Sequence, residues 1–99
     1  MPLSAASSMV IELVLLTDAV RAKDIEESKR LARRLARTAR VSGWPRIARQ
    51  ARAVELLAIL DAPLPHVGAA ADRLLVMAEQ HLHSLPDAGQ EREQSKTAS

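Results

Sequence analysis

The sequence predicts an all-α fold, specifically an antiparallel up-down four-helix bundle. Alanine and leucine, both strong helix formers, supply most of the apolar residues, whereas aromatic residues make up 1% of the 99-residue chain and there are three glycines. Short turn segments, the second and third of which contain glycine or proline, divide the chain into four segments in which apolar residues recur at helical spacing. The turns between these segments are short, which predicts that consecutive helices are antiparallel neighbours.

The first helix is expected from about residue 8 to residue 22, with Ser7 or Ser8 as its N-cap. Residues 1–7 are expected to be a flexible N-terminus. The expected inner stripe of this helix consists of Val10, Leu13, Val14, Thr17 and Val20.

The second helix is expected to start at Asp24, because the segment DIEE has the pattern of a capping box. Asp24 would accept from the amide of Glu27, and the Glu27 side chain would reach back. Gly43 follows the expected end, where a left-handed residue commonly terminates a helix. The expected inner stripe comprises Ile25, Ser28, Leu31, Ala32, Leu35 and Ala39.

The third helix is expected to begin at Trp44-Pro45, because proline is favoured at the first helical position. The segment DAPLP ends it, and Pro65 opens the fourth helix. The bundle is therefore expected over residues 8–85, followed by a disordered polar tail at 86–99. The expected inner residues are Ile47, Ala51, Val54, Ala58, Val67, Ala71, Leu74, Ala78, Leu82 and Leu85.

Several classes of function are disfavoured by composition. Cysteine is absent, which excludes disulfides and thiolate chemistry and fits a cytoplasmic location. The apolar run MVIELVLL is too short to span a bilayer. The histidines, at 66, 81 and 83, are expected to be solvated, since helical metal ligands are usually three or four residues apart. We therefore expect no catalytic residues, no metal, no cofactor and no enzyme activity.

Positive charge is concentrated in one part of the chain. Residues 21–52 hold eleven Lys/Arg and three Asp/Glu, although the formal net charge of the whole chain is +2. Pairs such as Arg33 and Arg37 lie four apart and repel each other, so local helix stability does not explain the clustering. We expect a face that binds an acidic partner. Its candidate residues are Arg30, Arg33, Arg34, Arg37, Arg40 and Trp44.

Trp44 has two open interpretations. It is either a hydrophobic lid on the turn between the second and third helices, or an exposed anchor at an interface, where tryptophan is enriched.

Two resemblances give this face different partners. LARTARVSGWPRIAR, within residues 35–50, resembles a helix-turn-helix segment, which implies DNA or RNA binding with bases read by Arg46, Arg49 or Gln50. This is the alternative function.

The favoured resemblance covers Asp18 to Leu57 and is to the histidine phosphotransfer (HPt) domain family. The matching positions are Ala19, Asp24, Ala32, Leu35, Ala39, Gly43, Ile47, Val54 and Glu55. The resemblance implies a four-helix bundle whose two central helices dock onto the receiver domain of a response regulator.

The family's phosphorylated histidine falls on Arg33, and its Lys and Gly fall on Ala36 and Arg37. A guanidinium stays protonated and has no free lone pair, so Arg33 cannot carry a phosphoryl group as imidazole does. The resemblance therefore implies a regulatory module without phosphotransfer that binds a receiver domain or histidine kinase. A second alternative is a homodimer that buries the aliphatic segment VIELVLL.

Overall fold

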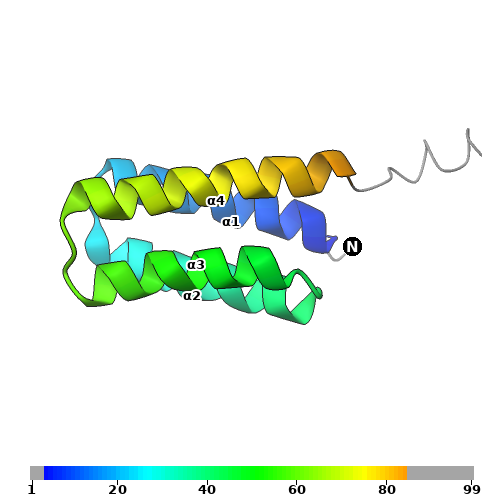
Figure 1. Ribbon diagram of the computed structural model, residues 1–99, viewed down its shortest axis with the longest axis horizontal. Helices are drawn as coiled ribbons and strands as arrows, with labels where there is room; N and C mark the ends of the chain where they lie inside the picture. Colours follow the sequence, from blue (N-terminus) through cyan, green and yellow to red (C-terminus); the bar gives the residue numbers. More distant parts are fainter. Residues whose placement is uncertain (1–3, 85–99) are drawn as a thin grey trace, which may run out of the picture.

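Residues 4–84 are described in the computed structural model, and they form four α-helices without a strand among them. The helices are α1 (Ala5–Arg21), α2 (Ile25–Val41), α3 (Pro45–Ile59) and α4 (Leu64–Ser84). Each packs against its neighbours along the chain, and α1 also packs against α4, so the four helices close into a ring (Figure 1). The expected all-α class is confirmed. The expected tail at 86–99 lies outside the described residues.

Helix α1 begins earlier than expected and buries a different stripe. Ser4 is the N-cap and accepts from the amide of Ser7 at 3.1 Å, so residues 5–7, expected to be flexible, are helical. Val10 and Val14, expected inside, are exposed. The buried residues of α1 are Met9, Glu12, Leu13, Leu16 and Ala19. Because aliphatic residues lie on both sides of this helix, periodicity alone does not identify the face that packs.

The other three helices bury the stripes that their spacing predicts, apart from a few residues at the edges. Ile25 and Leu82 are only partly buried, and Leu85 lies outside the described residues. The core combines leucines with fully buried alanines on α2, α3 and α4, whose small side chains allow close approach of the helices. The buried alanines of these helices are Ala32, Ala39, Ala51, Ala58, Ala71 and Ala78.

The turn after α2 has the structure that Gly43 predicts. Gly43 adopts φ 77°, its amide donates to the carbonyl of Arg40, and the amide of Trp44 donates to the carbonyl of Ala39 at 2.8 Å. These two bonds form a Schellman motif, which satisfies carbonyls at the helix end. Pro45 then occupies the first turn of α3, as expected.

The same motif ends α1 and α3 with residues other than glycine. Lys23 has φ 59° and Asp61 has φ 53°, and each donates to the carbonyl three residues earlier. Aspartate tolerates the left-handed region better than lysine because its short side chain bonds locally. Three repeats of one turn geometry therefore produce the antiparallel path of the chain.

We predict that Lys23→Gly stabilises the protein by about 0.5–1 kcal/mol, because glycine removes the left-handed strain while adding some freedom to the unfolded chain. Gly43→Ala should destabilise it by about 1 kcal/mol. Apart from Gly43 and its two neighbours in the chain, nothing lies within 4 Å of a Cβ added at Gly43, so that loss would come from backbone conformation rather than a clash. Urea unfolding measures both changes in stability. A Lys23→Gly variant that is less stable than the parent would contradict the presence of left-handed backbone strain at Lys23.

Candidate functional site: an arginine groove between α2 and α3

A groove of about 640 Å³ runs between α2 and α3 and is lined mainly by arginine. We call it the arginine groove. Its lining residues are Arg33, Ala36, Arg37, Arg40, Ala48, Arg49, Arg52 and Glu55. The two alanines leave room between the helices, while the long guanidinium side chains form the walls.

The antiparallel hairpin explains why these residues meet. Because the chain turns back at Gly43, each residue of α2 lies near a residue of α3, and the residue numbers of such a pair add up to about 85. Arg33 and Arg52 form one such pair, and Ala36 and Arg49 form another. Arg33, Arg37 and Arg40 follow i, i+4, i+7 spacing and so share one side of α2. Two positively charged rows therefore face each other across the groove.

The groove contains part of the predicted arginine face and two arginines that were not assigned to it. Arg33, Arg37 and Arg40 line the groove, whereas Arg30 and Arg34 do not. Arg49 and Arg52 come from α3. Their spacing of three residues, together with the register of the α2–α3 hairpin, is the sequence signal that could have identified them as groove residues. Because the prediction followed one helix, it missed the contribution of the second.

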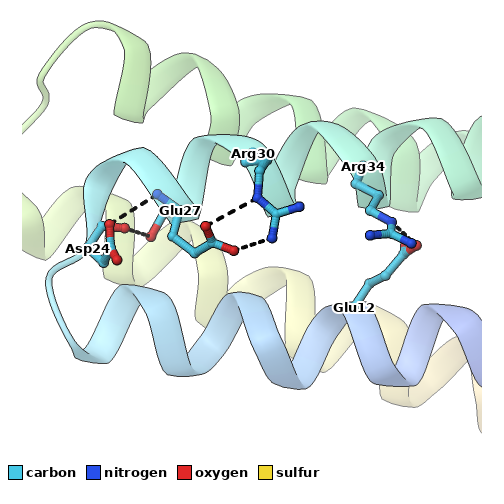
Figure 2. A network of polar contacts seen from close by, with 6 residues as sticks. Glu12, Asp24, Glu27, Arg30 and Arg34 are labelled. Atoms are coloured by element: carbon cyan, nitrogen blue, oxygen red, sulfur yellow. Dashed lines mark hydrogen bonds and ion pairs between the residues drawn. The ribbon is translucent and has the colours of Figure 1, made fainter.

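Arg30 is engaged with an acidic residue of its own helix. Arg30 pairs with Glu27 (Figure 2), and Glu26 pairs with Lys29 at 2.7 Å. Asp24 caps α2 as predicted by accepting from the amide of Glu27 at 3.1 Å. The Glu27 side chain is directed to Arg30 instead of reaching back, so half of the expected capping box forms.

Arg34 reaches across to α1. Its Nε lies 3.3 Å from Oε1 of Glu12 (Figure 2). The Thr38 hydroxyl donates to the same oxygen at 3.0 Å. Glu12 is 7% exposed, and its second oxygen has no hydrogen-bond partner among the described residues. No sequence pattern predicts this contact, because a glutamate that interrupts an aliphatic run is ordinarily expected to be exposed.

Within the arginine groove, one guanidinium is neutralised. Arg52 pairs with Glu55, whose side chain is buried, one turn further along α3. Arg33, Arg37, Arg40 and Arg49 have no carboxylate within ion-pair distance in residues 4–84. Four uncompensated guanidinium groups therefore give the groove a positive potential that attracts an anionic surface.

Trp44 packs as a lid rather than lining the groove. It is half-buried against the core, and its ring lies 4.7 Å from that of His81 on α4, centroid to centroid. His81, expected to be solvated, is therefore also partly buried. This contact joins the α2–α3 turn to α4, and a role of Trp44 in partner binding stays a prediction.

The helix-turn-helix alternative does not match the packing of α2 and α3. These helices lie side by side in opposite directions (Figure 1), whereas a helix-turn-helix pair crosses at about 90–120°. Gln50, one of the proposed base-reading residues, donates to the carbonyl of Ala70 at 3.0 Å and so holds α3 to α4. The segment is therefore a bundle hairpin.

No cluster of three or more His, Cys, Asp or Glu side chains within residues 4–84 is arranged to hold a metal ion. None of the four helices has both the length and the apolar character needed to cross a membrane. No family model, curated protein or solved structure matches the chain.

The contact between Glu27 and Arg30 predicts a pH effect. The hydrogen bond from the Arg30 guanidinium lowers the pKa of Glu27 below its ordinary value of 4.5. A pKa that is lowered in the folded state stabilises the protein at pH values above the ordinary pKa of the group. This contribution is lost as the pH falls through the lowered pKa. In Arg30→Gln, an NMR titration should find the Glu27 midpoint closer to 4.5, and an unchanged midpoint would contradict the contact.

Replacing Glu12 provides a test of the buried carboxylate. We predict that Glu12→Leu is neutral or stabilises the protein by about 1 kcal/mol, because it removes a buried charge whose polar partners are incomplete. Arg34→Leu should instead destabilise it by about 1 kcal/mol, since it leaves the carboxylate with less compensation. Urea unfolding of both variants measures this, and a Glu12→Leu variant destabilised by more than about 1 kcal/mol would show that the carboxylate is a net stabilising group.

Proposed function

We propose that this protein is a non-catalytic regulatory module that binds an acidic protein surface through the arginine groove. The observation that carries the proposal is the convergence of Arg33, Arg37, Arg40 and Arg49 on one groove, where none of the four has a carboxylate of residues 4–84 within ion-pair distance. Guanidinium groups suit this role because they bind carboxylates and phosphoryl groups through paired hydrogen bonds.

The partner that we favour is the receiver domain of a response regulator or a related histidine kinase. This choice rests on the resemblance of residues 18–57 to a histidine phosphotransfer domain, whose two central helices dock onto a receiver. Receiver active sites are clusters of carboxylates, so they are complementary in charge to the arginine groove. Arg33, at the position of the family's histidine, would pair with such carboxylates or with a phosphoryl group. The proposed role is to block or sequester the partner, and it includes the cytoplasmic location expected from the sequence.

Charge reversal within the groove tests the proposal. Arg33→Glu with Arg37→Glu should weaken binding to a receiver domain at least about 100-fold, because two attractive contacts become repulsive. Calorimetric titration with receiver domains measures the stoichiometry and the affinity. Both side chains are exposed, so the fold should be retained.

The matched control is Arg21→Glu with Lys23→Glu, which produces the same change of formal net charge on a different face. This control should bind the receiver domain nearly as well as the parent. An equal loss of affinity in both double variants would indicate that binding depends on net charge alone. An unchanged affinity of the groove variant for the receiver domain would refute the proposed site. Binding of nucleic acid instead of a receiver, with affinity falling steeply as salt rises, would favour the alternative function.

A further inference from the structure

The outward surface of α1 is apolar where a surface helix is normally polar. Val10, Ile11, Val14 and Leu15 are 40%, 47%, 54% and 47% exposed. We call these four residues the α1 outer face. Glu12, in the middle of the same segment, is buried instead. A helix with apolar side chains all round is typical of one covered on every side, whereas this bundle covers only one side of α1.

The α1 outer face has the spacing of a helix-pairing seam. Ser7, Ile11, Val14 and Asp18 follow each other at intervals of four, three and four residues. This is the spacing of core positions in a coiled coil, with Ile11 and Val14 at the centre. Val10 and Leu15 flank the seam on either side, which widens the apolar surface.

We propose that a second copy of this chain covers the α1 outer face, with the two α1 helices antiparallel about a two-fold axis. The seam is self-complementary in this arrangement, as a two-fold interface requires. Ile11 would pack against Val14 of the second copy, while Val10 would lie beside Val10 of the second copy on one flank of the seam and Leu15 beside its Leu15 on the other. All four aliphatic side chains of each copy are then covered by aliphatic side chains.

Charges at the two ends of the seam fit the same arrangement. The antiparallel pairing brings Asp18 over Ser7 of the second copy, in the first turn of its α1. That first turn has no acidic residue of its own, and the N-terminal end of a helix attracts negative charge. Each Asp18 would therefore supply the charge that the other copy's helix lacks.

The location of the arginine groove prevents repulsion between the basic grooves of two copies from opposing self-association. The groove lies between α2 and α3, and within residues 4–84 α1 packs against α2 and α4 but not against α3. The α1 outer face itself contains no charged residue. Two copies can therefore pair through α1 while their basic grooves remain apart and accessible, so this inference does not depend on the proposed function.

Sedimentation of the full chain over a range of concentrations tests the inference. The parent should change from monomer to dimer below about 1 mM, and Val14→Glu should weaken association about 100-fold, since a two-fold interface buries the new charge twice. Val76→Glu on α4, a position with 51% exposure, is the matched control and should associate like the parent. Circular dichroism should find all three chains equally helical.

Two results would overturn the inference. A parent chain that stays monomeric up to about 1 mM excludes a second copy as the occupant and points to a different protein on this face. Equal association of Val14→Glu and the parent places any dimer interface elsewhere.

Cross-linking tests the direction of the helices, because the chain has no cysteine of its own. A mixture of Ser7→Cys and Asp18→Cys chains should form mixed disulfide dimers on mild oxidation, whereas each variant alone should cross-link poorly. Disulfide formation requires close Cα atoms, so only the antiparallel arrangement brings these two positions together. Preferential cross-linking of like chains would overturn the antiparallel pairing.

Discussion

The left-handed residue that follows each of the first three helices determines the path of the whole chain. At Lys23, Gly43 and Asp61 the same pair of backbone hydrogen bonds ends a helix and turns the chain back within a few residues. Because these turns are so short, the register between adjacent helices has little freedom. That register brings Arg33 of α2 and Arg52 of α3 to the same groove.

Close packing of α2 against α3 and concentration of charge are linked through alanine. Ala32, Ala39, Ala51 and Ala58 are buried at the inner side of these helices and allow their backbones to approach. The outer edges then carry long arginine side chains, which repel each other in the free protein. A surface that is electrostatically unfavourable by itself and becomes favourable on binding an anion is the physical basis of the proposed function.

Helix α1 combines two features that are unusual in a surface helix, and the two have one cause. Glu12 lies inside because Thr38 and Arg34 of α2 supply partners for one of its oxygens. With the polar residue turned inward, the aliphatic residues of the α1 outer face are turned outward. The buried carboxylate and the proposed self-association surface are therefore opposite sides of the same helix orientation. The arginine groove, on other helices, is independent of it.

The sequence by itself determined the four helices, the cap at Asp24, the turn at Gly43 and the inner stripes of α2, α3 and α4, because capping, left-handed geometry and amphipathic spacing are local properties. It also indicated that residues 21–52 would carry a basic face. Only the tertiary structure decided which side of α1 is buried, because aliphatic residues lie on both sides of this helix and their spacing does not distinguish the two. It likewise decided which arginines act together. Arg30 and Arg34 are engaged by carboxylates, whereas Arg49 and Arg52 join the groove, since ion pairs and grooves depend on neighbours that are distant in the sequence.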